Sequence, residues 1–304
     1  MAAAAQMAAA PVTAAAARAL DWLSGAWEAR EDEDPRLAVE ALALSALCRL
    51  LCGSAGGAAD QVDRAIGRAI AEPAWAASSL PGSLVAAVGA LRQRNGFAAS
   101  AGRYLEALGA LSADELDGAG RSGESNGVLL RLALYGVAPS PPRAPAGLHR
   151  LRGSAGEVRR FASEVEACSA FGTAAVADEP AATLLEGAAI AAFRVYDLPL
   201  GMRLLRAAAY ACGRRRAAGL EFVRRSQCDD GSFGDYDTAL ARLRARGDRN
   251  APLRVKLPVT LQALWTLAEL ESPRFRLVRS ALMDRGEPPS HLRNDALRAD
   301  PGAP

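Results

Sequence analysis

The sequence has very few of the residues on which common enzyme classes rely. Its 304 residues include two histidines, His149 and His291, and Lys256 is the single lysine. Two histidines in or beside proline-rich segments make a Ser–His hydrolase or a zinc site unattractive. The sequence also has no Gly-x4-Gly-Lys loop and no convincing dinucleotide-binding fingerprint. We therefore expect no metal ion and no cofactor.

Cysteine is also scarce, and its pattern argues against a disulfide framework. The five cysteines are an odd number scattered over a long chain, at Cys48, Cys52, Cys168, Cys212 and Cys228. This pattern favours reduced, packed thiols. Cys48 and Cys52 have a spacing that suits a metal ion, but no second pair completes a site, so core packing is the preferred interpretation.

Neither the charge nor the apolar runs indicate a nucleic-acid or membrane partner. The formal net charge is +2, which creates no strong field toward polyanions. No stretch reaches the roughly 18 apolar residues that a membrane span requires. Residues 1–17 are mostly alanine, lack a basic leader and contain Pro11, so they form a poor secretory signal. We expect a cytoplasmic protein.

Apolar residues are plentiful, at 50% of the chain, and they recur every three or four residues. This period predicts helices, whereas the alternation typical of strands is hard to find. Pro35, Pro199 and Pro258 mark helix starts, and Gly53 and Pro73 mark helix ends. The predicted helices are 13–27, 36–52, 59–71, 83–94, 98–109, 125–135, 154–170, 181–195, 200–212, 214–227, 258–271 and 273–284.

The predicted organisation is a single all-α domain over residues 12–287. A disordered alanine-rich segment, 1–11, precedes it, and a frayed tail, 288–304, follows it. A proline-rich crossover spans 138–147, and the charged segment 235–251 is either a surface loop or a short extra helix. About six helix hairpins could close a ring, but an open bundle or a superhelical array of pairs has the same local pattern.

The strongest local motif is GLEFVRRSQCDDGSFG, at residues 219–234. Phe222 and Val223 would anchor one helix face in the core. The amide of Gln227 can satisfy backbone groups of the following turn. Gly231 supplies a backbone conformation that a Cβ would penalise, and Phe233 folds back onto the helix pair. We predict that Gln227 binds the backbone of its own turn, that Phe233 is buried and that strand content is near zero.

This motif resembles the repeat of squalene and oxidosqualene cyclases, protein prenyltransferase β-subunits and class II diterpene cyclases, with Phe233 where tryptophan is usual. The segment 257–270 resembles the inner helix that follows the motif in this family. Two N-terminal segments, ALDWLSGAW at 19–27 and LAVEALALSALCRLL at 37–51, are also similar to small uncharacterised actinobacterial proteins of this repeat class. The resemblance implies an α/α toroid of about six helix hairpins, or roughly twelve helices, whose inner helices line a central cavity.

The resemblance also implies candidate catalytic residues. Class II terpene cyclases protonate their substrate with an Asp-x-Asp-Asp motif, which DYDTAL at 235–240 resembles with one aspartate missing. Asp237 is then the candidate acid, buried and facing the cavity, and Asp235 is its modulator. The alternative is a solvated loop after a turn.

Other carboxylates are acid candidates by position. Glu186 and Glu40 each interrupt an apolar helical stretch, so either would suit acid–base chemistry if it faced inward and would simply be solvated if it faced outward. The end of the cavity near Glu186 could be closed by the residues that follow it, Arg194, Tyr196 and Asp197. Alternatively, these residues form an ordinary helix C-terminus with its usual charge partners.

Two features limit the chemistry that the resemblance implies. Protein prenyltransferases hold zinc partly through an Asp-x-Cys step, which this sequence lacks, so prenyl transfer is disfavoured. Aromatic residues make up only 5% of the chain, whereas cyclase cavities are typically lined by aromatic faces that stabilise cations.

The leading functional hypothesis is an enzyme of secondary metabolism. It would bind a hydrophobic small-molecule substrate, isoprenoid- or polyketide-like, and promote an acid-assisted cyclisation or isomerisation. The alternative is a non-catalytic toroid or helical-repeat protein that binds a lipid-like ligand or a partner protein. Buried inward carboxylates with aromatic neighbours would favour the enzyme, and a closed centre filled with alanine would favour the scaffold.

Overall fold

The structure is a computed structural model that describes residues 2–30, 35–52, 155–169, 176, 178–212 and 219–271. Within these residues 81% of the chain is helical, with eight helices and no strands. The helices are α1 (Ala2–Glu28), α2 (Pro35–Cys52), α9 (Ala155–Cys168), α10 (Glu179–Arg194), α11 (Leu198–Cys212), α12 (Leu220–Arg225), α13 (Asp237–Ala245) and α14 (Ala251–Glu271). The all-α prediction is therefore confirmed for the described part of the chain.

Four predicted helices agree with the structure to within two residues at each end. These are the predictions over 36–52, 154–170, 181–195 and 200–212, which correspond to α2, α9, α10 and α11. Five further predicted helices (59–71, 83–94, 98–109, 125–135 and 273–284), the proline-rich crossover 138–147 and the tail 288–304 lie outside the described residues.

The two ends of the described chain differ from the prediction. Helix α1 begins at Ala2, so it includes most of segment 1–11, for which disorder was predicted; alanine has the highest helix propensity and extends the helix. Helix α14 begins at Ala251, and Pro258 lies inside it instead of starting it. Leu253 and Leu257 are buried, and the packing of these side chains favours two additional turns before the proline.

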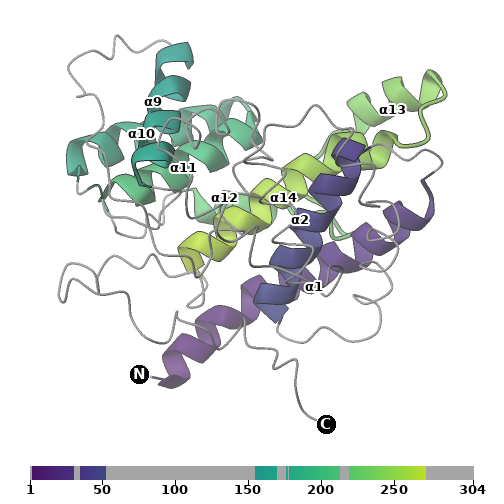
Figure 1. Cartoon of the computed structure of the whole chain (residues 1–304), viewed down its shortest axis with the longest axis horizontal. Helices are drawn as coiled ribbons and strands as arrows, with labels where there is room; N and C mark the ends of the chain where they lie inside the picture. Colours follow the sequence, from purple (N-terminus) through teal and green to yellow (C-terminus); the bar gives the residue numbers. More distant parts are fainter. Residues whose placement is uncertain are drawn as a thin grey trace, which may run out of the picture.

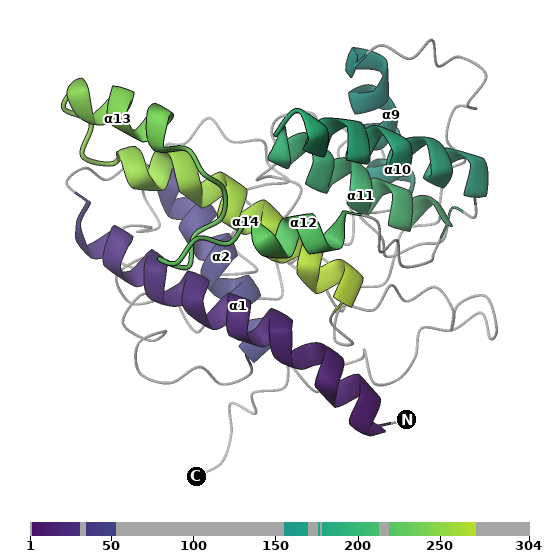
Figure 2. The same cartoon turned by 180° about the vertical axis from the view of Figure 1, so that it is seen from behind.

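Helix α14 occupies the centre of the described helices (Figures 1 and 2). It packs against α1 and α2 on one side and against α11 on the other, and α12 and α13 also contact it. Every residue from Val259 to Glu271 is buried. A helix that is covered all round is a core element, so α14 organises the packing of its neighbours.

Helices α9, α10 and α11 form a second group beside α14. Only Val195–Asp197 joins α10 to α11, and the two helices pack extensively as an antiparallel hairpin. The ring of Phe193 fills the space beside Gly201 and Gly219, where an added Cβ on either glycine would overlap it. Figure 2 shows α10 at the periphery of this group, away from α14.

A buried ion pair fastens α9 to α11. The Arg203 Nη2 atom lies 2.7 Å from Glu166 Oε2 and also donates to Ser163 Oγ at 2.8 Å. Arg203 Nε donates to the same carboxylate, so the contact is bidentate.

Among the helices that the structure describes, none has the length and apolar character that a membrane crossing requires.

Candidate functional site

The loop of the 219–234 motif ties the end of α12 to α1. The Gln227 Nε2 atom donates to the carbonyl of Gly231 at 3.0 Å and to the carbonyl of Ala15 at 3.0 Å. The Gln227 side-chain oxygen accepts a hydrogen bond from Arg18. The prediction that Gln227 binds the backbone of its own turn is confirmed, and the same amide also holds α1.

The end of this loop docks on α14. Phe233 is fully buried, as predicted, and its backbone N–H donates to Thr260 Oγ1 at 3.1 Å. Gly231 has a φ of +92°, and an added Cβ would overlap the carbonyl of Arg18. The motif is therefore a brace between α1 and α14. Val223 is buried as predicted, but the expectation that Phe222 lies in the core is wrong, since its side chain is 38% exposed.

The single lysine has a structural partner in the same loop. Lys256 Nζ lies 3.0 Å from Asp230 Oδ2, and the other oxygen of Asp230 accepts hydrogen bonds from the backbone and hydroxyl of Ser232. Burial raises the pKa of Asp230, but the hydrogen bonds from Ser232 and Lys256 outweigh it and hold the pKa below its usual value.

The two aspartates of DYDTAL lie together at the start of α13, and both are exposed. The backbone N–H of Asp237 donates to Asp235 Oδ1 at 3.3 Å. The expectation that Asp237 is buried is therefore wrong. Asp237 is the first residue of α13, where a solvated carboxylate is favourable beside the positive end of the helix dipole. This arrangement matches the alternative of a solvated segment after a turn, and 235–251 contains a short helix.

Tyr196 connects this segment to the α10–α11 corner. Its hydroxyl accepts a hydrogen bond from the backbone N–H of Asp235 at 2.8 Å. Its ring lies 6.3 Å from the ring of Phe222 and 6.3 Å from that of Tyr236. Tyr196 has a φ of 60°, in the left-handed region where glycine is usual, and occupies the position at which a helix end turns back.

Of the remaining predicted candidates, Glu40 is half-buried on α2, and the others lie on or beside α10. Glu186 is half-buried in the middle of that helix, and Arg194 is exposed at its end. Asp197 pairs with Arg159 at 3.3 Å and accepts a hydrogen bond from the backbone of Leu200 at 3.3 Å. Asp197 therefore has the partners of an ordinary helix junction.

A more concentrated set of buried polar groups lies on α14. Gln262, Trp265, Thr266 and Glu269 follow one another at intervals of three, one and three residues, which places them along one face of the helix. All four side chains are buried. Trp265 Nε1 donates to Glu269 Oε1 at 3.0 Å.

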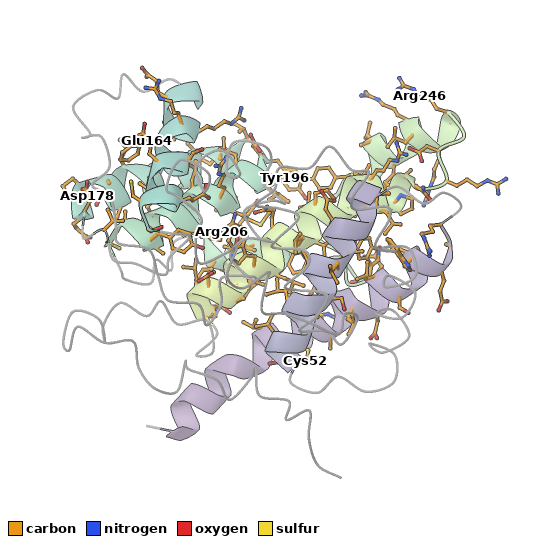
Figure 3. All side chains as sticks on the ribbon, viewed as in Figure 1. Cys52, Glu164, Asp178, Tyr196, Arg206 and Arg246 are labelled. Carbon is orange, nitrogen blue, oxygen red and sulfur yellow. The ribbon has the colours of Figure 1, made fainter. Side chains whose placement is uncertain are left out.

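Arg206 of α11 completes this set, which we call the Arg206 cluster (Figure 3). Its side chain is 1% exposed, and its guanidinium carbon lies 3.9 Å from the centre of the Trp265 ring. Arg206 Nη1 donates to Thr266 Oγ1 at 2.7 Å and to the Gln262 carbonyl at 3.3 Å. A buried guanidinium requires such partners because removing it from water is costly.

The cluster contains a carboxylate, a cation and an amide donor in one water-poor place. The oxygen of the Gln262 amide accepts a hydrogen bond from Arg206, which fixes the direction of the amide. Its buried Nε2 atom has no hydrogen-bond partner in the part of the chain that the structure describes. The Glu269 carboxylate is the group of this cluster that can accept a proton from a bound molecule, and the Gln262 amide can donate a hydrogen bond to it.

The sequence contained a partial signal for this cluster. Polar residues recur on one face of an otherwise apolar helix at 262, 266 and 269. Arg206 had no comparable signal, because arginine is abundant in this chain and usually exposed.

The described residues contain no group of three or more histidine, cysteine, aspartate or glutamate side chains that could hold a metal ion. His149 and His291 lie outside the described residues, so the absence of zinc remains a prediction.

Comparison of the chain with family models, with curated proteins and with solved structures finds no match.

Proposed function

We propose that the chain is a cytoplasmic α/α toroid protein of secondary metabolism that transforms a hydrophobic molecule, with Glu269 as its acid–base group. The observation that carries the proposal is the buried pair of Trp265 and Glu269 beside Arg206. A buried carboxylate with an aromatic neighbour is the feature that favours an enzyme over a scaffold. The braced loop at 219–234 and the α10–α11 hairpin support the toroid.

Glu269 is a better candidate than the residues indicated by the family motif. Asp235 and Asp237 are exposed, whereas Glu269 is 1% exposed. A general acid or base works best where water does not compete for the proton. Because the cluster is buried, a substrate reaches it only when a packed element moves, and we expect slow ligand entry.

The cation of the cluster favours a polyketide-like, carbonyl-bearing substrate over an isoprenoid. Arg206 covers a face of Trp265, the side chain that would otherwise stabilise a carbocation. A fixed positive charge opposes a developing carbocation but stabilises an enolate.

The reaction that fits these groups is a proton shift. The Glu269 carboxylate accepts a proton from the carbon next to a carbonyl. The C–H electron pair forms a C=C bond to the carbonyl carbon, and the π electron pair of the C=O bond moves onto the oxygen to give an enolate. If a C=C bond adjoins the deprotonated carbon, the enolate is a dienolate, and the protonated Glu269 returns the proton to the far carbon of that C=C bond, which yields an isomer with a shifted double bond. Alternatively, the enolate carbon attacks a second carbonyl of the substrate and closes a ring, and the resulting alkoxide takes the proton from Glu269. Neither route needs a further reactant.

The test starts from the native protein. Native mass spectrometry of the purified chain should identify a co-purifying hydrophobic molecule with a carbonyl group, and its conversion is then followed. Glu269→Gln retains an acceptor for Trp265 and should lower turnover by about two to four orders of magnitude. Glu186→Gln and Asp237→Asn are the matched controls and should leave turnover nearly unchanged. Full activity of the Glu269 variant would refute the assignment.

The alternative function is non-catalytic binding of a lipid-like ligand or a partner protein. The exposed apolar side chains favour it, since the large ones among the described residues all lie on α10, at its end or on α12: Leu184, Ile190, Val195, Tyr196 and Phe222. If all three variants keep full activity and the purified chain carries a bound lipid, this alternative is supported.

A further inference from the structure

Helix α10 has an exposed apolar face opposite the side that packs on α11. Leu184 is 40% exposed and Ile190 is 36% exposed. The outer face of α10 consists of the exposed residues Thr183, Leu184, Gly187, Ile190 and Ala191. The hydroxyl of Thr183 donates to the backbone carbonyl of Glu179 at 3.1 Å, so its polar group is directed back into the helix. Figure 2 shows this helix at the edge of the described structure.

The outer face of α10 is symmetric about Gly187. Leu184 and Ile190 lie three residues before and after it, about 60° to either side on a helix of 3.6 residues per turn. Thr183 and Ala191 lie four residues before and after it. A two-fold axis through Gly187 would therefore place Leu184 on Ile190 of the partner subunit, and Thr183 on Ala191 of the partner subunit.

The charges of α10 are complementary in the same antiparallel arrangement. Glu179 is exposed in the first turn and Arg194 is exposed in the last turn. A two-fold axis at the middle of the helix brings Arg194 to the acidic first turn of the second helix. Opposite charges at the two ends favour the antiparallel pairing and oppose the parallel one.

Gly187 supplies an independent reason to expect a second helix here. It lies in the interior of α10, where glycine costs about 1 kcal/mol relative to alanine. An added Cβ would meet nothing within 4 Å in the chain itself, so packing within the chain does not require glycine. A small residue at the crossing point of two helices allows their backbones to approach closely.

We infer that the chain forms a symmetric homodimer in which two copies of α10 pack antiparallel across a two-fold axis at Gly187. The interface is isologous, as is usual for homodimers. One helix pair is at the small end of specific interfaces, so the dimer should be weak, with a dissociation constant of roughly micromolar size.

Sedimentation equilibrium of the full chain over a wide concentration range tests this inference. The wild type should pass from monomer to dimer. Ala191→Glu should weaken dimerisation at least about tenfold, because each new carboxylate would be removed from water against Thr183 of the partner subunit. Ala241→Glu is the matched control, since Ala241 is also an exposed helical alanine, on α13. A wild type that stays monomeric, or a dimer that survives in Ala191→Glu, overturns the inference.

A cross-link keeps the test decisive if Ala191→Glu does not fold. Two copies of Gly187→Cys meet at the axis, where close backbones bring the thiols within disulfide reach. Mild oxidation should yield a covalent dimer of Gly187→Cys but not of Ala241→Cys or of the wild type with its native cysteines. Equal cross-linking of all three proteins would contradict the proposed axis.

Discussion

Gly231 connects two parts of the chain that are more than two hundred residues apart in sequence. Its left-handed backbone, with a φ of +92°, turns the loop after Gln227 so that it lies directly against the carbonyl of Arg18. Because that contact is with backbone, a side chain at position 231 could not be relieved by a rotamer change. Glycine is thus required at position 231 both by the positive φ and by the lack of room for a Cβ atom.

Replacement of Gly231 by alanine should cost more stability than the same change at Gly247. Gly247 also has a positive φ, +79°, but an added Cβ would meet nothing within 4 Å there. Gly247→Ala should lower the free energy of unfolding by about 1–2 kcal/mol, the cost of a left-handed non-glycine residue. Gly231→Ala should lower the free energy of unfolding by at least about 1 kcal/mol more, because its added Cβ would overlap the Arg18 carbonyl. Urea denaturation measures both, and equal losses would contradict the close packing of the loop on α1.

Asp230 should make the free energy of unfolding depend on pH in the acid range. Its pKa is lowered in the folded chain, so its contribution to the free energy of unfolding is fully present above the unfolded pKa of about 3.9. That contribution is lost as the pH falls through the folded pKa. The stability difference between the wild type and Asp230→Asn should therefore be constant near neutral pH and shrink below about pH 4. A difference of the same size at pH 7 and pH 3 would show that ionisation of Asp230 is not involved.

Among the ion pairs that the structure describes, Arg203–Glu166 and Arg159–Asp197 join α9 to the α10–α11 hairpin, and they differ in burial. The side chains of Arg203 and Glu166 are 12% and 4% exposed, whereas those of Arg159 and Asp197 are 54% and 37% exposed. Arg203→Met leaves a buried carboxylate without its cation and should cost about 3–5 kcal/mol. Arg159→Met should cost less than about 1 kcal/mol. Denaturant unfolding compares the two, and equal small losses would mean that Glu166 finds another partner.

The helix pattern of the described chain was largely predictable, because apolar periodicity depends on local sequence. Helices α2, α9, α10 and α11 were predicted with nearly correct ends. The start of α14 was predicted wrongly, because proline is favoured in the first turn of a helix, which places the start at Pro258. The two turns before it are stabilised by tertiary burial of Leu253 and Leu257, which has no local signal. The role of Gln227 and the burial of Phe233 followed from the motif, whose function is to brace helices.

The candidate site was less predictable than the helices. Asp237 was selected for its resemblance to a motif, and resemblance carries no information about exposure. The Arg206 cluster depends on a contact between α11 and α14, with Arg206 and Gln262 separated by 56 residues. Such a pairing is fixed by the packing of two helices and has no local signature. Only the polar positions of α14 could be read from its period of three and four residues.

Among the described helices, α14 is the buried element against which most of the others pack. Helices α1, α2 and α11 lie against it, and the loop of the motif is hydrogen-bonded to it through Thr260. Helix α13 follows the opposite pattern, since Leu240 is its one buried residue. The two helices are consecutive in sequence but should differ widely in local stability.

Native-state hydrogen exchange measures this difference. Amides of residues 259–271 in α14 can exchange only when its neighbours separate, so they should report the global free energy of unfolding. Amides near the end of α13, at 241–245, have equivalent helical hydrogen bonds but little burial and should exchange by local opening, at least about a hundredfold faster. Both sets belong to helices, so intrinsic hydrogen bonding cannot account for such a gap. Similar rates in the two helices would contradict the central position of α14, and with it the burial of the Arg206 cluster on which the proposed chemistry depends.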